Sequence, residues 1–415
     1  MAKKAQASLK PGLSMPHVLC LGWKLVVLVS IVLCVLTFLR IQQYPQATGS
    51  YSSAHLPRKS RVLSYQFSGD LKIAFLFLVR KNLPLDFLWA SFFENVEKAK
   101  FSIYIHSEPG FVFDESNTRS AFFFNQQSNN SIKVAWGEAS MIEAERVLFE
   151  EALQDPANQR FILLSDSCVP LYNFSYIYKY LTDSPRSFVD SFFDKKDVRY
   201  NPKMSPVIHR NKWRKGSQVI FFNDDFALWP DEWIDIKPAT VLLTSMKFPK
   251  VQFGRYDIWV TLIRRHAEVV VDDETVFPIF RKYCKRRPPI DPSSGRKNLK
   301  LQKQHNCIPD EHYVQTLLAM NDLEPELERR TVTYTSWNQS MANTENEAWH
   351  PFTFSYSDSG PQQIKRIRDI NHVYYETEFR TEWCSNNSTS VPCFLFARKF
   401  SQGAAMRLLS EGSSW

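Results

Sequence analysis

The sequence lacks the short motifs that mark several common classes of ligand site. Only 12 of its 415 residues are glycine, and the turn Arg80–Pro84 after the first expected strand contains none. That argues against the phosphate-cradling loop expected of a lumenal sulfotransferase. No cluster of cysteine and histidine has the spacing of a zinc site. There is no strict Asp-x-Asp triplet, and the Asp-Asp pairs at 224–225 and 272–273 would point to opposite faces of a strand, a poor geometry for a metal.

The composition predicts a folded domain with acidic partners. A hydrophobic content of 44% and an aromatic content of 14% exclude disorder for most of the chain. The net charge of +8 suits nucleotides, polyanionic glycans or a lipid surface. Lysine and arginine are spread along the chain without a recognisable nucleic-acid module, so nucleic acid is not an expected partner.

One long apolar run lies near the N-terminus. Residues 18–39 are interrupted only by Lys24 and have the length of one membrane-spanning helix. Lys3, Lys4 and Lys10 precede the run, so the positive-inside rule keeps the N-terminus cytosolic. A cleaved signal peptide is the alternative, but the run is long for one and no small-residue cleavage site follows. We expect a type II membrane protein with a cytosolic tail (1–17), a signal anchor (18–39), a polar stem (40–69) and a lumenal domain (70–415).

Cysteines and glycosylation sequons agree with a lumenal domain. Five cysteines lie outside the apolar run, so at least one is free or pairs between chains. Cys384 and Cys393 bracket a short polar loop, and Cys284 and Cys307 bracket a basic one; a disulfide would close each loop, although the sequence leaves the connectivity open. The sequons, which support lumenal exposure only weakly, are at Asn129, Asn173, Asn338, Asn386 and Asn387.

Strand-like and helical segments alternate along the lumenal part. The expected strands are Lys72–Val79, Phe101–His106, Ile132–Val134, Phe161–Leu164, Phe188–Phe193, His266–Val271 and Cys393–Ala397. The expected helices are Leu85–Ala99 and Ser140–Leu153, the second opened by a capping box of Ser140 and Glu143. This alternation predicts a parallel, doubly wound sheet with ligand sites at the carboxyl ends of its strands. Polar residues follow two of these ends, at His106–Glu108 and at Ser165–Asp166.

The segment Cys307–Leu318 has the pattern of a helix start. Pro309 takes an early helical position, two carboxylates follow it, and an apolar stripe comes after them. A carboxylate there feels the positive end of the helix dipole, which favours its ionised form. A fixed, ionised Glu311 is what a general base needs to take a proton from a sugar hydroxyl. Helix capping is the alternative explanation for these residues taken alone.

Taken in order, eight segments resemble the core-2/I-branching β-1,6-N-acetylglucosaminyltransferase family, in particular its plant branch. They lie between Lys72 and Arg407 and read HSEPG, WGEASMIEAERVLFEEAL, RFILLSDSCVPLYNF, NPKMSPVIHRNKWRKGSQ, PDEHYVQTLL, SWNQS, HVYYETEFR and CFLFARKF. The resemblance implies an α/β, GT-A-like Rossmann-type lumenal domain behind a single N-terminal transmembrane helix. It also implies Golgi localisation, inverting transfer from a UDP-sugar (UDP-GlcNAc above all) to a glycan or glycoprotein acceptor, and no divalent metal or other cofactor.

The same resemblance assigns site residues. Glu311 would be the general base. Without a metal, the departing UDP needs basic side chains; Lys399 matches the lysine of the family, and Arg368 best matches its arginine, with Arg366 and Arg380 as alternatives. Further donor contacts are expected from residues at the strand ends, namely His106, Glu108 and Asp166. Acceptor contacts are expected from Trp213, Arg214, Lys215 and Trp337.

One segment departs from the family pattern. The basic motif of the family normally runs straight on from Trp213–Gln218 into the residues that begin here at Trp259, whereas 219–258 separate them in this chain. Our hypothesis is a retained intron or a misplaced exon boundary, and the alternative is a genuine lineage-specific insertion. Because the insertion lies beside the expected acceptor site, it bears directly on activity.

Two other functions stay open at this stage. Related plant enzymes extend arabinogalactans, so a β-glucuronosyltransferase is the first alternative. The second is a catalytically inactive lumenal glycan-binding protein. The sequence leaves the acceptor, the linkage position and homodimer formation undecided.

Overall fold

The computed structural model describes residues 28–33, 67–194, 199–216, 219–221, 252–253, 259–286, 306–336, 351–375, 378–386 and 389–411. The chain divides into two units, Met1–Lys59 and Ser60–Trp415. Of the expected signal anchor only 28–33 are described, and they are helical. Within the described part of the chain, no helix is long and apolar enough to cross a membrane. The expected cytosolic tail and most of the stem lie outside the described residues.

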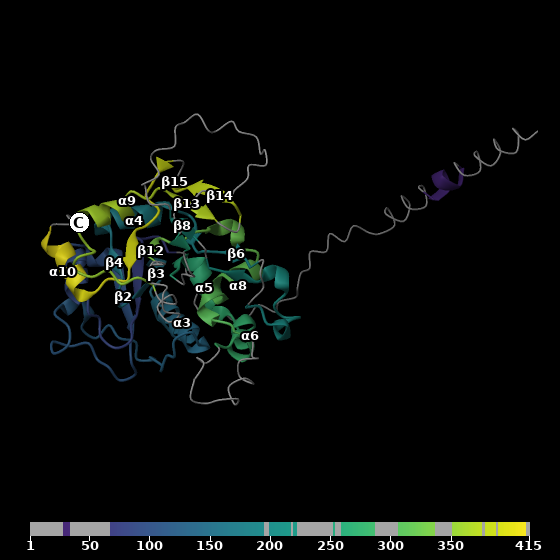
Figure 1. Cartoon of the computed structure of the whole chain (residues 1–415). Helices are drawn as coiled ribbons and strands as arrows, with labels where there is room; N and C mark the ends of the chain where they lie inside the picture. Colours follow the sequence, from purple (N-terminus) through teal and green to yellow (C-terminus); the bar gives the residue numbers. More distant parts are fainter. Residues whose placement is uncertain are drawn as a thin grey trace, which may run out of the picture. The chain divides into compact units, whose positions relative to one another are not determined.

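A six-stranded sheet forms the centre of the second unit (Figure 1), with the order β11-β5-β10-β3-β1-β2. Its members are β1 (Lys72–Leu78), β2 (Phe101–His106), β3 (Asn158–Ser165), β5 (Ser187–Phe188), β10 (Thr261–Ile263) and β11 (Leu327–Glu328). Strand β1 pairs in parallel with β2 and β3, whereas β10 is antiparallel to β3 and β5. The apolar runs in β1 and β3 suit strands that are covered on both faces. A mixed α/β fold with a parallel-stranded sheet is therefore confirmed.

Helices cover both faces of this sheet, because successive side chains of β1 point to opposite sides. Ile73, Phe75 and Phe77 belong to the core cluster that contains side chains of α2 (Asp86–Phe93), α4 (Phe174–Asp183) and α10 (Gln402–Ser410). Ala74, Leu76 and Leu78 belong to the other cluster, with α3 (Ala139–Leu153), α5 (Arg264–Asp272), α6 (Val276–Tyr283) and α8 (Tyr313–Met320). In Figure 1, α10 lies to the left of the central strands, and α5 and α8 lie to their right.

Smaller sheets surround the central one. Strands β12 (Thr333–Thr335), β17 (Phe396–Arg398) and β4 (Val169–Pro170) form one of them. Strands β14 (Arg380–Trp383), β13 (His372–Tyr375), β8 (Val219–Phe221) and β9 (Gln252–Phe253) form another. Two-stranded pairs join β6 (Phe192–Phe193) to β7 (Arg214–Lys215) and β15 (Ser385–Asn386) to β16 (Thr389–Ser390). Helix α9 (Pro361–Arg368) precedes β13.

The described residues of the 219–258 segment take part in one of these sheets. Strand β8 pairs with β9, and on its other side with β13 through Val219 and Ile220. The segment therefore adds two strands to the β13–β14 hairpin. Its origin as a retained intron remains a hypothesis.

Several local predictions are corrected by the structure. Residues His266–Val271 lie in helix α5 and not in a strand; the buried Ala267, Val270 and Val271 have helical spacing. Residues Ile132–Val134 form no regular strand. The expected strand Phe188–Phe193 is divided between β5 and β6.

The start of α3 also differs from the prediction. Its N-cap is Glu138 and not Ser140. The Ser140 hydroxyl instead accepts a hydrogen bond from the Ala135 N–H at 2.9 Å. Ser140 therefore fixes the turn before the helix, and the predicted capping box with Glu143 does not form.

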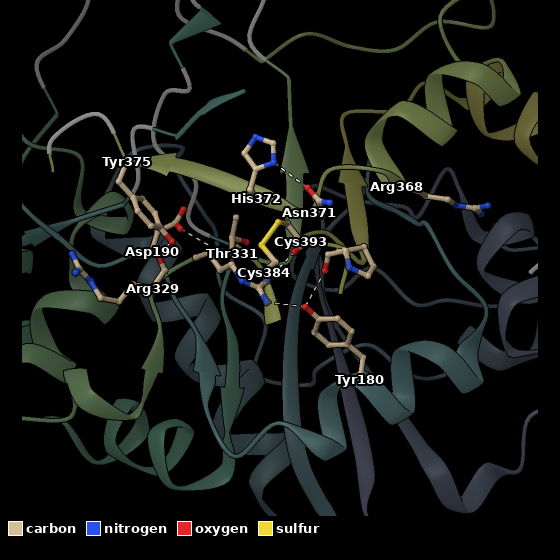
Figure 2. The surroundings of a disulfide bond; sticks show 12 residues. Tyr180, Asp190, Arg329, Thr331, Arg368, Asn371, His372, Tyr375, Cys384 and Cys393 are labelled. Carbon is tan, nitrogen blue, oxygen red and sulfur yellow. Dashed lines mark hydrogen bonds between the residues drawn. A yellow bond between two sulfur atoms is a disulfide. The ribbon is translucent and has the colours of Figure 1, made fainter. Parts of the chain in front are cut away.

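Both expected cysteine pairs are disulfide-bonded, Cys284 to Cys307 and Cys384 to Cys393, and Cys168 is buried and free. Buried side chains hold the Cys384–Cys393 region in place (Figure 2). Arg330 donates to the Cys393 carbonyl and to the Tyr180 hydroxyl, both at 2.8 Å, and Tyr180 donates to the Pro392 carbonyl at 3.0 Å. These bonds fix the segment that leads from the disulfide to β17.

The sequons have different surroundings. Asn129 and Asn173 are exposed, and Asn173 also caps α4. Asn386 is half-buried and donates to the Tyr180 carbonyl at 3.4 Å. Asn338 and Asn387 lie outside the described residues.

Candidate active site

A cleft with a volume of about 1400 Å³ opens at the carboxyl ends of the parallel strands. Leu78, His106 and Ser165, the last residues of β1, β2 and β3, line it. The 3₁₀ turn η8 (Pro309–Glu311) and the residues from Arg398 to Gln402 also line it. The cleft therefore lies where parallel α/β sheets usually bind their ligands.

Glu311 lines this cleft from η8, two residues before α8 begins. The prediction placed it in the first turn of the α-helix; the structure places it in the 3₁₀ turn that leads into the helix. Its side chain is 13% exposed and forms an ion pair with Arg199, which is equally buried. The guanidinium favours the ionised carboxylate, as a general base requires.

Backbone contacts fix the position of Glu311. Its carbonyl accepts hydrogen bonds from the Gly216 N–H at 3.1 Å and from the side-chain amide of Gln315. One residue on, His312 contacts the Arg214 carbonyl through Nδ1 at 2.8 Å and stacks on Trp213 at 4.4 Å. Strand β7 thus lies along the start of α8 and holds it.

A buried network supports α8 from the opposite side. Arg146 of α3 donates to the Tyr313 hydroxyl at 2.8 Å and to the Asp273 carbonyl at 2.8 Å. Tyr313 donates to the Asp273 carboxylate at 2.9 Å. That carboxylate also accepts hydrogen bonds from the N–H groups that open α6. The network joins α3, α6 and α8 behind the cleft.

Two further carboxyl groups lie at or beside η8. Asp310 lines the cleft yet is only 7% exposed, and burial raises its pKa to about 6. Glu145 lies on α3, which packs against η8; burial, and then the nearby Asp310, raise its pKa well above the usual range. Asp310 Oδ1 and Glu145 Oε1 have no hydrogen-bond partner among the described residues. Desolvation therefore favours the protonated form of both groups, whereas Glu311 has a cation beside it.

The predicted donor-binding residues at the strand ends all line the cleft. His106 is buried, and burial lowers its pKa to about 4, so its ring is neutral. Its Nε2 accepts a hydrogen bond from the Ile132 N–H at 3.0 Å, which leaves the proton on Nδ1. Asp166 pairs with Arg80 at 3.1 Å, and the exposed Glu108 lies 3.9 Å from Lys81.

The basic residues near the C-terminus are partly corrected. Lys399 lines the cleft as predicted, and its neighbour Arg398 lines it too, with the guanidinium 4.6 Å from the Trp259 ring. Arg368 does not line the cleft; it lies 5.2 Å from the Tyr172 ring and points away from the disulfide region in Figure 2. Arg380, an alternative, pairs with Glu378 and Glu382. Arg398 therefore lies in the cleft lining next to Lys399, and the donor contact of Arg368 stays a prediction.

Of the predicted acceptor-binding residues, one lines the cleft and two do not. Lys215 lines the cleft, buried, with its ammonium 3.7 Å from the Asp194 carboxylate. Trp213 is fully buried, stacks on Phe280 and does not line the cleft, which corrects the predicted sugar contact. Arg214 pairs with Glu324 at 2.7 Å outside the cleft lining, a second correction. Trp337 lies outside the described residues.

Sequence reasoning missed several residues that line the cleft. These are Asp194, Arg199, Asp310, Arg398 and Trp136. Asp310 and Arg398 directly precede predicted site residues in the chain, which was the available signal. Trp136 is 51% exposed and stacks against Arg286 at 4.1 Å. Asp194 directly follows the expected strand Phe188–Phe193, and Arg199 lies two residues before the family-like segment that begins at Asn201, which were the available signals.

Metal ligands were not predicted. Within the described part of the chain, no group of three or more histidine, cysteine or acidic side chains is arranged to hold a metal ion. Asp273 of the 272–273 pair caps α6, and the 224–225 pair lies outside the described residues. Independence from metal stays a prediction.

Comparison with known proteins agrees with this geometry. A model of the Core-2/I-Branching enzyme family matches residues 73–233 and 235–368. The chain is 49% identical over 352 residues to "Glycosyltransferase BC10" of Oryza sativa subsp. japonica, across 82% of this chain and 76% of the relative. The chain belongs to the Core-2/I-Branching enzyme family and is a glycosyltransferase.

Proposed function

We propose that the chain transfers a sugar from a UDP-sugar to a glycan hydroxyl with inversion, without a metal ion, and with Glu311 as the general base. One observation carries this proposal. Glu311 lines a cleft at the carboxyl ends of parallel strands, and the consecutive residues Arg398 and Lys399 line the same cleft. A carboxylate for the attacking hydroxyl and cations for a leaving diphosphate are the two requirements of such a transfer.

The reaction would be a single in-line displacement. Glu311 takes the proton of the acceptor hydroxyl as its oxygen forms a bond to the anomeric carbon of the donor. The bond from that carbon to the diphosphate oxygen breaks on the opposite side, and UDP leaves with the electron pair. An α-linked donor sugar thereby becomes a β-linked product. The two contacts to the Glu311 carbonyl help to hold the base for this step.

Arg398 and Lys399 would balance the charge that develops on the diphosphate. An arginine provides a planar, permanently charged group, and a lysine adds a compact point charge. Arg398 is the last residue of β17, whose approach is fixed by Arg330 and the Cys384–Cys393 disulfide. His106, Asp166 and Glu108 would contact the rest of the nucleotide at the strand ends.

Charge compensation near Glu311 favours a neutral donor sugar, with GlcNAc as the first choice. Arg199 and Lys215 line the same cleft as Glu311. These two cations are already matched by Glu311 and Asp194. The buried Asp310 adds a third carboxyl group there. A glucuronate carboxylate would therefore meet acidic neighbours beside Glu311, so the β-glucuronosyltransferase is the second candidate.

Golgi residence as a single-pass type II protein remains part of the proposal, supported by the apolar run at 18–39, the lysines before it and the two disulfides.

The presence of both Glu311 and Lys399 in the cleft argues against an inactive glycan-binding protein. Homodimer formation stays open.

The test is UDP release by the purified full-length chain in detergent, in EDTA, with UDP-GlcNAc and UDP-glucuronic acid as donors and a panel of glycan acceptors. Glu311→Gln is the inactive control, and Glu143→Gln, at a half-buried position on α3 outside the cleft lining, is the matched one. Turnover with UDP-GlcNAc that only Glu311→Gln abolishes is the expected result. Turnover with UDP-glucuronic acid alone would overturn the donor assignment. Absence of turnover in a folded protein across the panel would favour the glycan-binding alternative.

A further inference from the structure

Arg199 faces two neighbouring carboxyl groups of η8. Its guanidinium forms an ion pair with Glu311, and its positive charge also acts on Asp310. All three side chains line the cleft. The ion pair engages one oxygen of the carboxylate that must receive the acceptor proton, so a second partner for Arg199 would free that oxygen.

We propose that Asp310 is a positioning residue. When the acceptor hydroxyl binds to Glu311, Arg199 leaves Glu311 and forms an ion pair with Asp310. The proposal rests on Glu311 being the general base, as stated above. Asp310 directly precedes Glu311 in η8, so a small movement of the long arginine side chain exchanges one partner for the other. Asp310 Oδ1, which has no hydrogen-bond partner among the described residues, is an acceptor suited to the guanidinium.

The other charged groups around Asp310 are committed elsewhere. Arg286 stacks on Trp136 at 4.1 Å and donates to its carbonyl at 3.4 Å. Glu138 precedes α3, with its carboxylate 4.0 Å from Lys285. Glu145 faces Asp310 from α3 and is desolvated. Arg199, the largest attractive charge on Asp310, is the cation positioned to pair with it.

The exchange makes the activity depend on the ionisation of Asp310. Burial raises the pKa of Asp310 to about 6, so its carboxyl is protonated in acid and attracts Arg199 only weakly there. Above this pH the carboxylate competes for Arg199, and Glu311 becomes a freer and stronger base. We expect kcat to rise across about pH 6 for this reason.

The experiment is a double-mutant cycle on the full-length chain in detergent with Asp310→Asn, Arg199→Gln and both together. Asp310→Asn should lower kcat about tenfold at pH 7 and remove the rise near pH 6. The double variant should behave as Arg199→Gln alone, because Asp310 acts through Arg199. UDP affinity, measured by calorimetry, should stay within about twofold of the unmodified protein, and Asp310→Glu should restore much of kcat.

The matched control is Asp322→Asn, an exposed carboxylate that pairs with Lys212 outside the cleft lining. Additive effects in the cycle would overturn the exchange of Arg199 between Glu311 and Asp310, and so would a rise in kcat near pH 6 that persists in Asp310→Asn. Neither result bears on the role of Glu311 as the base, which Glu311→Gln tests separately. If the unmodified chain shows no transfer, the proposed function fails and the exchange fails with it. Should Asp310→Asn not fold, Arg199→Gln alone must lose the rise near pH 6, and its persistence would overturn the proposal.

Discussion

The Gly216 N–H donates a hydrogen bond of 3.1 Å to the carbonyl of Glu311. This bond connects the end of the basic segment Trp213–Gly216 to the turn that carries the candidate base. The 219–258 segment begins three residues after Gly216. The position of Glu311 is therefore linked by one short piece of backbone to the segment that the sequence analysis predicts to be an insertion.

We expect Glu311→Gln to abolish transfer while preserving donor binding. Glutamine keeps the size of the side chain and removes its ability to take a proton, so kcat should fall on the order of a thousandfold. Product formation and UDP calorimetry measure the two effects separately. Transfer at more than a tenth of the original rate would exclude Glu311 as the base.

Substitutions of the basic residues should distinguish those that line the cleft from Arg368, which does not. Lys399→Met and Arg398→Met should each raise the donor KM at least about tenfold, because each removes a cation from the proposed diphosphate site. Arg368→Met should change the donor KM less than about twofold, since Arg368 lies on Tyr172 outside the cleft lining. Initial rates at varied donor concentration provide the measurement. A larger increase in donor KM for Arg368→Met than for the other two variants would show that Arg368 binds the donor.

The sequence predicted those features that depend on local pattern. The apolar runs at Lys72–Leu78 and Phe101–His106 are strands as expected, because parallel strands buried on both faces have near-continuous apolar sequences. The amphipathic His266–Val271 segment contains several β-branched residues, yet packing against α3 makes it helical. Contacts between residues that are far apart in the chain could not be predicted from the sequence pattern. Arg199 reaches Glu311 across more than a hundred residues, and no local signal announces that contact.

The same limit explains the misassigned aromatic and basic residues. Trp213 occurs in a family-like basic motif, which favoured a sugar contact, but its ring fills the core between His312 and Phe280. A tryptophan in a sequence has no marker that separates a binding surface from a buried one. Arg368 matched by position relative to the C-terminus, whereas the fold brings Arg398 to the cleft.

We expect Asp310 to make stability fall as the pH rises from about 4 to about 6. The unfolded chain releases this proton near the ordinary value of 3.8, whereas the folded chain keeps it until about 6. The folded state thus binds more protons in this window, and raising the pH favours unfolding, by at most about 3 kcal/mol for a shift of this size. Glu145, whose pKa is also raised, acts in the same direction.

The measurement is a set of thermal melts between pH 4 and pH 7, compared between the unmodified chain and Asp310→Asn. Other carboxyl groups titrate in both proteins, so the difference between the two isolates Asp310. The variant should gain melting temperature relative to the unmodified chain as the pH rises. A constant difference across the range would contradict the raised pKa.

Arg330 should be more important for stability than its neighbour Arg329. Arg330 is 4% exposed and satisfies the Cys393 carbonyl and the Tyr180 hydroxyl, so Arg330→Met leaves buried polar groups unpaired. We expect a loss of about 2–4 kcal/mol in the free energy of unfolding. Arg329→Met is the comparison, because Arg329 is half-buried, pairs with Glu378 and donates to the Ser191 carbonyl at 2.9 Å, so its loss should be smaller than that of Arg330. Equal losses in chemical denaturation would contradict the assigned role.

Deletion of residues 219–258 tests the departure from the family. If the segment is a retained intron, the deleted chain should fold, because among the described residues its removal takes β8 and β9 from the β13–β14 sheet and leaves the six central strands intact. It should also transfer sugar faster than the full chain, because Gly216 would again be followed by the ordinary family sequence. Transfer assays of both forms, with thermal melts for folding, measure this. Sequencing transcripts across codons 215–262 gives an independent answer: abundant message containing the segment, together with a deleted form that no longer folds, would show that the two strands are a genuine part of this enzyme.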